Sequence, residues 1–412
     1  MSKHIWLINQ YAMPPEYEVR IQTLKRAQYL QEFGYEVTII SGSYLHNTEI
    51  NLIKDRKPFL EASYNGINYI HIRTSKYSGN GIRRIYNLIE FPVRFFLHYK
   101  KFNKPDIIDH LATVPFGNIL YFIAKKIKAR YIVDVVDLWP ESFVAMGLVK
   151  KNNMFLKLAY RFEKWLYEKA DDVVFSMEGG LDYIIEKGWN IGSGGKIDLK
   201  KIHYINNGVD VKDFDYNKQN YLIEDKDLEK DVTFKVIYIG SVRLANNLKL
   251  IIDAAKELIE HPRIVFLIYG DGDDRLYLEK YCKENNIANV IFKQKWVELK
   301  YVPYILSKSS LNLLNYKQTA IERFGGSQSK SFQYMASGRP IVSNIDMAYC
   351  PIKKFRLGIA ATFKDAKEYA DAILKIASLE KEEYIKLCEN SRKASYHYDY
   401  KELAKKFIKI IE

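Results

Sequence analysis

The sequence contains little cysteine, and its three cysteines give no sign of a shared site. Cys282, Cys350 and Cys388 lie far apart and form no CxxC or Cys/His pattern. Neither a zinc site nor a disulfide framework is therefore indicated, and this usage fits a reducing compartment.

Long apolar runs are also missing. No stretch approaches the ~18 apolar residues that a membrane-spanning helix needs. The N-terminus enters the apolar run His4–Ile8 without the basic, apolar and small-residue segments of a secretory signal peptide. We therefore expect a cytoplasmic protein that has no transmembrane anchor.

Positive charge is what the sequence has in excess. Its 412 residues carry a formal charge of +13, while apolar residues (48%) and charged residues (27%) occur in ordinary proportion. A chain of this length is too long for one typical core, which favours two domains. The charge favours a negative partner, such as nucleic acid, anionic lipid headgroups or a phosphorylated substrate. The alternative is general solvation by lysine.

The first half of the sequence alternates strands with helices. Helical periodicity covers Val19–Phe33 and ends at Gly34, and amphipathic helices separate the later strands. The predicted strands are Ile5–Asn9, Glu36–Ile40, Asn68–Arg73, Asp106–Asp109, Tyr131–Val136, Asp171–Ser176 and Lys201–Ile205. This pattern is typical of a parallel sheet with helices on both faces.

The same alternation begins again after a polar region. Ile191–Lys196 has the composition of a surface insertion, and the charged, aperiodic stretch Asp213–Asp231 indicates a domain boundary nearby. Beyond it, the predicted strands are Phe234–Ile239, Arg263–Tyr269, Asn289–Phe292, Leu311–Leu314, Ile341–Asn344 and Gly358–Phe363. The predicted helices are Asn246–Ile259, Arg275–Glu284, Asp365–Ser378 and Tyr400–Ile411.

Together these patterns predict an α/β protein with two doubly wound Rossmann-like domains. They would face one another across a cleft at the carboxyl ends of both sheets. The first domain would span residues 1–205 and the second 206–389. The C-terminal region, about 390–412, could pack on either domain.

One predicted helix, residues 82–101, combines bulky apolar and aromatic side chains with basic ones. Lys125, Lys126, Lys128 and Arg130 extend that charge further along the chain. Such a segment can lie in the headgroup region of an anionic membrane, with its aromatic side chains inward. The alternative is that much of its apolar face belongs to the core, and the sequence favours neither interpretation.

The stretch Gly325–Pro340 predicts a helix that begins at a glycine-rich loop. Ser327 or Ser329 would cap it, and a Gly-Arg-Pro sequence would end it. Its first turn would offer N–H groups and a partial positive charge to a phosphate, and Lys330 would add a full charge. Lys330 and Gln333 would share one face, with apolar side chains packed behind them. An ordinary surface helix is the alternative.

Four further turns follow predicted strands. Gly240-Ser241-Val242-Arg243, with Asn246 at the start of the next helix, predicts a second anion-binding turn. Gly270-Asp271-Gly272 allows close backbone approach, as around a base or ribose. Asn206–Asp210 predicts a tight turn between the domains, and Asp137-Leu138-Trp139-Pro140-Glu141 offers two carboxylates and an aromatic ring to an acceptor. For each turn alone, ordinary packing is the alternative.

Taken in order, these stretches make the chain resemble the GT-B fold glycosyltransferases, specifically the retaining family 4 enzymes, over essentially its whole length. The motifs that carry the resemblance are Asn9-Gln10-Tyr11, Arg20 before Gly34-Tyr35-Glu36-Val37, Asp137-Leu138-Trp139-Pro140-Glu141, Asn207-Gly208-Val209-Asp210 with Phe214, Gly240-Ser241-x-Arg243, Gly270-Asp271-Gly272, and Ser327-x-x-Lys330 through Gly338-Arg339-Pro340. Two of them, Asp-Leu-Trp-Pro-Glu and Ser-x-x-Lys, look most like the branch that builds bacterial surface polysaccharides, including fucosamine transferases with UDP-linked donors.

The resemblance implies roles for these positions. The donor would be bound in the C-terminal domain by Gly240, Ser241, Arg243 and Asn246 (diphosphate), by Gly270, Asp271 and Gly272 (nucleoside), by Gly325, Gly326, Ser327 and Lys330 (sugar and diphosphate), and by Gln333 (ribose). The acceptor would meet Asn9, Gln10, Tyr11, Arg20, Asp137 and Glu141. Lys330, Arg243 and Asp137 would be the catalytic residues.

Two features depart from the family's pattern. Its usual glutamates fall here on Gly325 and Gln333, and its usual Arg and Lys fall near Ser241 and Asn246. Glutamine can still hydrogen-bond a ribose diol, and Arg243 and Lys330 would supply the displaced charge.

The expected mechanism stabilises the leaving diphosphate. Lys330, Arg243 and the amides of Gly326 and Ser327 would do this in a closed, water-poor cleft. We expect no metal or other cofactor, because no DxD-like element sits convincingly after a donor-side strand. Retention of anomeric configuration follows from the resemblance alone.

The expected partners are a nucleotide sugar, expected in its UDP form from the resemblance to this branch, a glycan or polyprenyl-diphosphate-linked acceptor, and, under the membrane interpretation, the anionic inner face of the plasma membrane. Two alternatives keep the fold: a sugar-nucleotide epimerase, which would consume donor without acceptor, and a non-catalytic GT-B scaffold. Nucleic-acid binding ranks last, because the basic and aromatic residues form no recognisable module.

Overall fold

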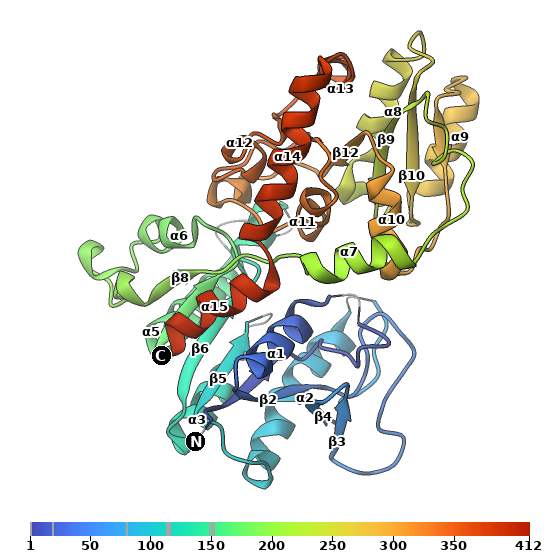
Figure 1. Ribbon diagram of the computed structural model, residues 1–412. Coiled ribbons are helices and arrows are strands. Elements are labelled where there is room, and N and C mark those ends of the chain that lie inside the picture. The colour runs from blue at the N-terminus through green and yellow to red at the C-terminus, as the bar shows by residue number, and fades with distance from the viewer. Residues whose placement is uncertain (1, 19, 80, 113–116, 148, 150–152) are drawn as a thin grey trace. The chain divides into compact units, whose positions relative to one another are not determined.

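The computed structural model describes residues 2–18, 20–79, 81–112, 117–147, 149 and 153–412 (Figure 1). The chain divides into two compact units. Unit 1 comprises Met1–Asn206 and Leu403–Glu412, and unit 2 comprises Asn207–Glu402. The division falls near the start of the last helix, α15 (Tyr400–Ile411), so the final residues of the chain return to the first unit.

Unit 1 is built on an eight-stranded sheet with the order β3-β4-β2-β1-β5-β6-β7-β8. The strands are β1 (His4–Ile8), β2 (Glu36–Gly42), β3 (Phe59–Tyr64), β4 (Ile67–Ile72), β5 (Ile107–Leu111), β6 (Arg130–Val135), β7 (Asp172–Phe175) and β8 (Ile202–Tyr204). All neighbours pair in parallel except β3 and β4. The strand order reverses between β1 and β5, which is the switch point of a doubly wound sheet.

The antiparallel edge strand β3 is a correction to the predicted all-parallel sheet. Asn65 and Gly66 both have positive φ (51° and 80°), as a tight hairpin turn between antiparallel strands requires. β3 is only half-buried, so its sequence lacks the continuous apolar run of the central strands. The Asn-Gly pair was the available signal.

The helices of unit 1 are α1 (Gln22–Glu32), α2 (Ile82–His98), α3 (Asn118–Ile127), α4 (Glu141–Ala145), α5 (Met154–Lys169) and α6 (Gly180–Glu186), together with most of α15. The first helix begins at Gln22 rather than at the predicted Val19, which lies outside the described residues. Arg20 therefore precedes the helix, because its backbone N–H is held by the Glu18 carboxylate (2.8 Å).

Unit 2 contains a six-stranded, wholly parallel sheet with the order β11-β10-β9-β12-β13-β14. The strands are β9 (Phe234–Ile239), β10 (Ile264–Tyr269), β11 (Val290–Phe292), β12 (Leu311–Leu314), β13 (Ile341–Ser343) and β14 (Gly358–Ala360). The helices are α7 (Val211–Asn220), α8 (Leu248–Glu257), α9 (Arg275–Glu284), α10 (Val302–Ser307), α11 (Ser329–Ala336), α12 (Pro351–Lys354), α13 (Ala366–Ala377) and α14 (Lys381–His397).

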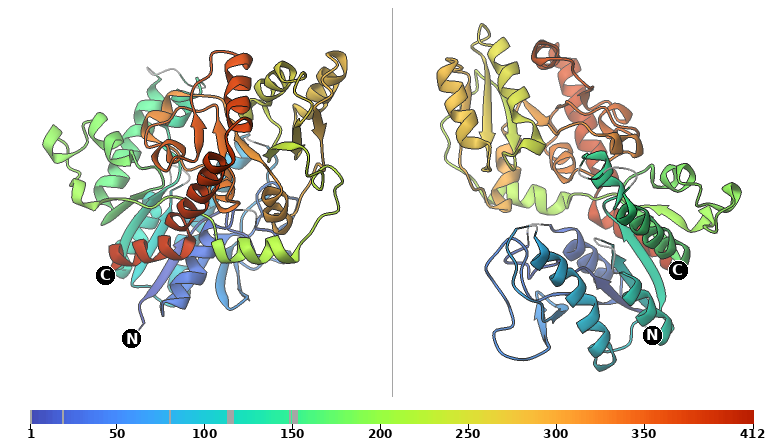
Figure 2. Two further views of the ribbon diagram at one scale, coloured as in Figure 1. Left: turned by 45° about the horizontal axis from the view of Figure 1, so that its top comes forward. Right: turned by 180° about the vertical axis from the view of Figure 1, so that it is seen from behind.

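Two apolar cores, one on each face, hold the second sheet between its helices (Figure 2). Successive side chains of β10 alternate between them: Leu267 and Tyr269 join the core under α11, whereas Phe266 and Ile268 join the core under α8 and α13. Burial on both faces explains the uninterrupted apolar sequence of this strand. The predicted pair of doubly wound Rossmann-like domains is confirmed.

Two helices of unit 2 correct the sequence prediction. The stretch Asp213–Asp231, predicted to be aperiodic, begins inside α7, which Asp210 caps by accepting the N–H of Asp213 (2.9 Å). Only Val211 and Phe214 of α7 are buried, too few to produce a clear apolar period. The long, mostly polar helix α14 buries only small side chains and was not predicted for the same reason.

Candidate active site

The strongest candidate site of unit 2 lies at the switch point of its sheet. The strand order reverses between β9 and β12, and ligands of doubly wound sheets bind outside the carboxyl ends of the strands at such a point. Gly240 and Ser241 follow β9, and Asn315 and Tyr316 follow β12. The amino end of α11 reaches the same place, as the contacts of Lys330 show.

Lys330 is the centre of this candidate site. Its Nζ donates a hydrogen bond to the Tyr238 hydroxyl (2.8 Å) and lies 4.4 Å and 5.2 Å from the ring centres of Tyr238 and Tyr316. A Cβ atom at Gly240 would lie 2.4 Å from Lys330 Cε and 2.6 Å from Nζ, so only glycine leaves room for this side chain. Gly240 and Lys330, which were both predicted to meet the donor, therefore lie against one another.

Lys330 is half-buried, and its ammonium group is partly removed from water. Among the described residues, no carboxylate forms an ion pair with it. Desolvation lowers the pKa of Lys330 to about 7. Cation–π contacts and one hydroxyl offset only part of the cost of burying an ammonium ion. The electrostatics of this site therefore favour the binding of an anion.

The loop before α11 differs from the prediction. Neither Ser327 nor Ser329 caps the helix: the N-cap residue is Gln328, and its side chain makes no capping hydrogen bond. The Ser327 hydroxyl instead accepts the backbone N–H of Asn207 (2.9 Å), which ties the predicted interdomain turn to this loop. Behind the polar face, Phe332, Met335 and Ala336 are buried in the core, as predicted.

Ser241 and Asn246 are joined directly, because the Ser241 hydroxyl donates to Asn246 Oδ1 (3.0 Å). Buried Asn315 fixes the next loop by donating to the carbonyls of Asn246 (2.8 Å) and Asn247 (2.7 Å). Arg243 is exposed at the start of the short 3-10 helix Leu244–Asn246. The two cations predicted for the diphosphate thus differ in exposure: Lys330 is half-buried and Arg243 is exposed.

The glycines of Gly270-Asp271-Gly272 have a packing role. A Cβ atom would lie 1.9 Å from the Gly240 carbonyl oxygen if added at Gly270, and 2.2 Å from the Val242 carbonyl oxygen if added at Gly272. These two glycines therefore allow two adjacent turns to meet. Arg275, which the sequence analysis did not select, donates to the carbonyls of Gly270 and Lys293 and fixes this edge of the sheet.

No nearby glutamate takes the place of those missing at Gly325 and Gln333. Glu322 lies in a capping box, where its carboxylate accepts the N–H and the hydroxyl of Thr319 (2.8 Å each). Gln333 is half-buried and lies one turn after Lys330, on the same side of α11. Gly325 has a φ of +83°, a value that glycine adopts readily.

In unit 1, three predicted acceptor residues make internal hydrogen bonds. Asn9 donates to Thr23 Oγ1 (2.9 Å), and Gln10 donates to the side chain (2.7 Å) and backbone (3.1 Å) of Asn87. The Glu141 carboxylate accepts from Lys187 Nζ (2.6 Å) and from the Tyr160 hydroxyl.

The other three acceptor residues are arranged differently. The Tyr11 ring lies among basic side chains, with the Arg20 guanidinium 6.0 Å from its centre. Asp137 is exposed after β6, although the surrounding protein raises the pKa of its carboxyl by desolvation while Arg20 lowers it.

A small pocket adjoins Asp137 and contains a second acid that the sequence analysis missed. It is lined by Ala112, Asp137, Trp139, Phe162, Glu163, Leu166 and Tyr167. Glu163 is buried and accepts hydrogen bonds from the hydroxyls of Tyr183 (2.8 Å) and Tyr167 (3.0 Å). Burial raises the pKa of Glu163 to about 8, against the effect of these hydrogen bonds.

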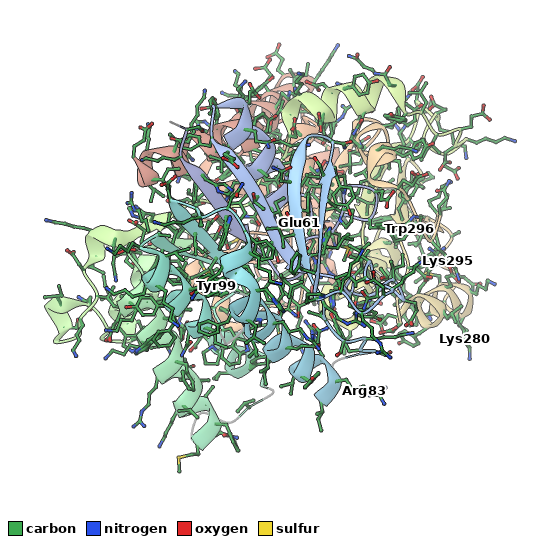
Figure 3. All side chains as sticks on the ribbon, turned by 90° about the horizontal axis from the view of Figure 1, so that it is seen from below. Glu61, Arg83, Tyr99, Lys280, Lys295 and Trp296 are labelled. Carbon is green, nitrogen blue, oxygen red and sulfur yellow. The ribbon has the colours of Figure 1, made fainter. Side chains whose placement is uncertain are left out.

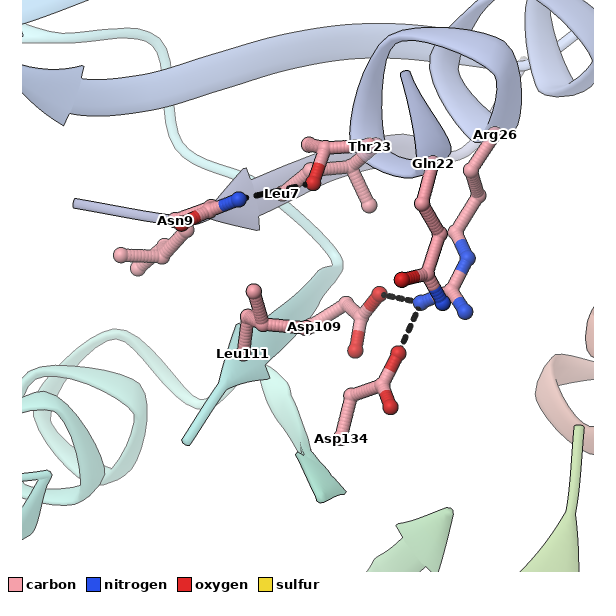
Figure 4. Close-up of a pocket in the computed structure, with 9 residues that line it drawn as sticks. Leu7, Asn9, Gln22, Thr23, Arg26, Asp109, Leu111 and Asp134 are labelled. Carbon is pink, nitrogen blue, oxygen red and sulfur yellow. Dashed lines mark hydrogen bonds and ion pairs between the residues drawn. The ribbon is translucent and has the colours of Figure 1, made fainter. Parts of the chain in front are cut away.

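A buried ion cluster lies under the start of α1 (Figure 4). Arg26 Nη1 donates to Asp109 Oδ2 (2.6 Å) and to Asp134, and the Arg26 guanidinium lies 4.9 Å from the Phe407 ring centre. Burial raises the pKa of Asp109 to about 7, while Arg26 lowers it and Asp134 raises it. The cluster joins α1, β5, β6 and α15, and we assign it a structural role.

Searches of the described part of the chain found neither a metal site nor a membrane span. No group of three or more His, Cys, Asp or Glu side chains there is arranged to hold a metal ion. No helix in the same residues is both long and apolar enough to cross a bilayer.

Two protein-family models match the chain in succession, and the first match extends seven residues past the unit boundary. Residues 19–213 match the model described as Glycosyltransferase Family 4, and residues 222–396 match the model described as Glycosyl transferases group 1. The second match contains Gly240, Lys330 and the rest of the candidate site in unit 2. A comparison with curated proteins found no match.

Solved structures share the fold over the whole chain at low sequence identity. Sucrose-phosphate synthase from Thermosynechococcus elongatus has a TM-score of 0.72 and 16% identity, covering 99% of this chain and 98% of that one. The α,α-trehalose 6-phosphate synthase from Burkholderia multivorans has a TM-score of 0.74 and 12% identity (100% and 98%). Anabaena Alr3699/HepE in complex with UDP-glucose has a TM-score of 0.64 and 14% identity (99% and 99%).

The two doubly wound sheets and these structural matches show the GT-B fold. With the match to the Glycosyl transferases group 1 model, the class is defined: the chain is a glycosyltransferase with this fold. More particularly, it contains a group 1 glycosyl transferase domain at residues 222–396, preceded by a region at 19–213 that matches Glycosyltransferase Family 4.

Proposed function

We propose that this glycosyltransferase moves a hexosyl or N-acetylhexosaminyl group from a UDP-linked donor to a glycan or polyprenyl-diphosphate-linked acceptor, with retention of anomeric configuration. Its place would be in the synthesis of cell-surface polysaccharide. Unit 2 binds the donor in this proposal, and unit 1 binds the acceptor.

The observation that carries the proposal is the environment of Lys330. A half-buried ammonium group with two tyrosine rings, one hydroxyl and no paired carboxylate among the described residues favours the binding of an anion. A donor diphosphate supplies that anion, and Lys330 stabilises the charge that develops as the bond to the sugar breaks. The protein groups act here without a metal.

The neighbouring residues complete the donor site in this proposal. Exposed Arg243 folds over the diphosphate from the Gly240–Ser241 turn, and the amides of Gly326 and Ser327 face its oxygens. Gln333 hydrogen-bonds the ribose, and Gly270, Asp271 and Gly272 border the nucleoside. UDP as the nucleotide is supported by the Anabaena protein, which has the same fold and was solved with UDP-glucose.

On the acceptor side, Asp137 is the exposed acid that meets the attacking hydroxyl group. Glu163 lies in the adjoining pocket, where its raised pKa makes it a hydrogen-bond donor at neutral pH. Trp139 lines the same pocket and offers a ring face on which a sugar can stack. Glu141 holds Lys187 and contributes to the shape of this region.

A second part of the proposal places unit 1 on the anionic inner face of the plasma membrane. Three of its helices carry large exposed apolar side chains: Ile82, Ile85, Tyr86, Val93 and Leu97 on α2, Phe122 on α3, and Met154, Phe155, Leu158 and Phe162 on α5. Lys126 of α3 lies over the Phe96 ring of α2 (4.8 Å), and Tyr121 of α3 meets Trp165 of α5 (5.2 Å). The three helices therefore form one layer.

The charge of this layer suits anionic lipid. Arg83, which projects at the edge of the molecule in Figure 3, and Arg94, Lys100, Lys101, Lys125, Lys126 and Lys128 are basic. Glu90, the acid of α2, is buried and paired with Arg94 (2.7 Å). Exposed apolar side chains beside basic ones are the composition of an interfacial helix.

A thermal-shift screen of UDP- and GDP-sugars tests the donor assignment. A donor that binds only the folded protein raises its melting temperature by mass action. At a hundred times its dissociation constant, the donor increases the free energy of unfolding by about 2.7 kcal/mol. We expect a selective shift with one UDP-sugar. Conversion of that donor to an isomer without acceptor would instead identify an epimerase, and the absence of any shift would favour a non-catalytic scaffold.

A further inference from the structure

We propose that Arg20 and Arg84 form a second anion-binding site in unit 1, around Tyr11, which binds the phosphate or diphosphate group of the acceptor. This inference deepens the proposed function and rests on it for the identity of the acceptor. The site itself is argued from contacts within unit 1.

The two arginines converge on one aromatic ring. Arg84 donates to the Tyr11 hydroxyl through Nη2 (3.3 Å) and Nε (3.4 Å). The guanidinium carbon atoms of Arg84 and Arg20 lie 5.7 Å and 6.0 Å from the Tyr11 ring centre. Both side chains are positively charged and contact the same ring, so an anion that binds both would offset their mutual repulsion. One guanidinium group can donate two parallel hydrogen bonds to the oxygens of a phosphate, so phosphate is a well-matched ligand.

A histidine completes the surroundings without adding charge. The His46 ring lies 4.8 Å from the Tyr11 ring, and its Nδ1 is hydrogen-bonded with the Tyr77 hydroxyl (2.5 Å). Burial, Arg20 and Arg84 lower the pKa of His46 to about 4, so it is neutral at physiological pH. Both arginines contribute to this lowered pKa, in keeping with their shared position around Tyr11.

Three acids of the surrounding segments have other partners, whereas the exposed Asp137 carboxylate interacts electrostatically with Arg20. The Glu18 carboxylate accepts the backbone N–H groups of Met13 and Arg20 (2.8 Å each). Glu49 pairs with Lys76, and Glu90 pairs with Arg94. Within the described residues, Arg20 is exposed and forms no ion pair, so it is available to a ligand from solvent.

The position of the site indicates where its ligand comes from. Arg84 lies in the first turn of α2, a 17-residue helix whose amino end adds a partial positive charge. Its neighbours Ile82 (84% exposed) and Ile85 (52% exposed) begin the apolar surface proposed to meet the membrane. A diphosphate held by Arg84 would thus have a prenyl chain beside it in lipid. The chemical class is a phosphate or diphosphate monoester carried on a lipid.

Inorganic pyrophosphate is the probe for the site itself, measured by isothermal titration calorimetry in a Lys330→Met background that removes the donor-side cation. We expect one pyrophosphate per chain to bind in this background, and the addition of Arg20→Gln and Arg84→Gln to weaken it at least tenfold. The matched control is Arg83→Gln, which removes the same charge from the neighbouring position of α2. Equal affinity in the control and the double variant, or no binding in the Lys330→Met background, would overturn the proposal.

Vesicles distinguish the two sources of phosphate. The double variant should lose binding to phosphatidylcholine vesicles that carry a small fraction of polyprenyl diphosphate, yet keep its binding to phosphatidylglycerol vesicles. The reverse result would show general headgroup attraction and overturn the assignment. If the double variant does not fold, Arg20→Gln alone serves, because that side chain is exposed.

The proposed function can fail separately from this site. Loss of pyrophosphate binding in the arginine variants, in a protein whose wild-type form binds no nucleotide sugar, would support the anion site and reject the donor assignment. Normal nucleotide-sugar binding, with pyrophosphate binding insensitive to both arginines, would reject the anion site alone.

Discussion

At the scale of single residues, Lys330 is the side chain whose surroundings bear most directly on the proposed chemistry. Its ammonium group lies between Tyr238, Tyr316 and the bare backbone of Gly240. A side chain at Gly240 would displace the ammonium group of Lys330. A carboxylate partner would neutralise its charge. The environment of Lys330 is therefore suited to a ligand that brings its own negative charge.

The pH dependence of donor binding follows from this lysine. Without ligand, desolvation holds the pKa of Lys330 at about 7, and a bound diphosphate should raise that pKa by favouring the charged form. Affinity for a UDP-sugar should therefore be greatest below pH 7 and fall as pH rises above 7, with proton uptake on binding. Calorimetry in two buffers of different ionisation enthalpy measures that uptake. Constant affinity and no uptake between pH 7 and 9 would contradict the assignment.

Glu163 gives a stability prediction with a defined pH window. Its ordinary pKa is 4.5, and burial raises it to about 8 in the folded protein. Folding therefore takes up a proton between these values, and the free energy of unfolding falls as pH rises through that window. Glu163→Gln removes this effect.

The melting temperature of Glu163→Gln, relative to wild type, should consequently increase from pH 5 to pH 8. Glu168→Gln, on the same helix, changes an acid that pairs with Lys164 near the surface and serves as the control. Melting curves of wild type and Glu163→Gln that stay parallel across these pH values would show that Glu163 is ionised in the folded protein.

At the scale of elements, α2 carries the membrane proposal. Its buried side holds Phe91 and Phe95 in the core of unit 1, whereas Ile82 and Leu97 on its outer side are 84% and 68% exposed. The two interpretations left open by the sequence therefore describe opposite sides of one helix. The core interpretation accounts for the inner side and leaves the outer side without a partner among the described residues.

Substitution of that outer side should weaken membrane binding without unfolding the protein. Ile82→Ser with Leu97→Ser is expected to reduce sedimentation with anionic vesicles at least tenfold, because an inserted side chain contributes about 1.5–3 kcal/mol. Leu244→Ser with Leu276→Ser is the control, since these side chains are 74% and 72% exposed on unit 2. Equal binding by both double variants, or none by wild type at low salt, would reject this surface.

The elements that the sequence predicted well are those with strong periodic burial. β9, β12, α9 and α15 begin and end where predicted. β3, α7 and α14 were missed in whole or part because each buries too little apolar surface to leave a period. The Ser327 cap failed for a tertiary reason, since the hydroxyl is engaged by Asn207.

At the scale of the whole molecule, both units repeat one plan, in which a doubly wound sheet presents its switch point to a ligand. The order of the motifs was enough to predict this architecture and its glycosyltransferase class. It was not enough to show which site residues are engaged internally. Asn9, Gln10 and Glu141 form such contacts, while Tyr238, Arg84 and Glu163 reach their sites only through the fold.

Binding of UDP to wild type and to Lys330→Met, measured by calorimetry at pH 7, tests the central claim most directly. A charge-assisted hydrogen bond contributes about 1.5–3 kcal/mol, so the variant should bind UDP at least tenfold more weakly. Its melting temperature should stay equal or rise, because methionine removes a partly desolvated charge and leaves Tyr238 its bond to the Ser241 carbonyl (2.8 Å). Equal affinity for UDP in the two proteins would contradict the account.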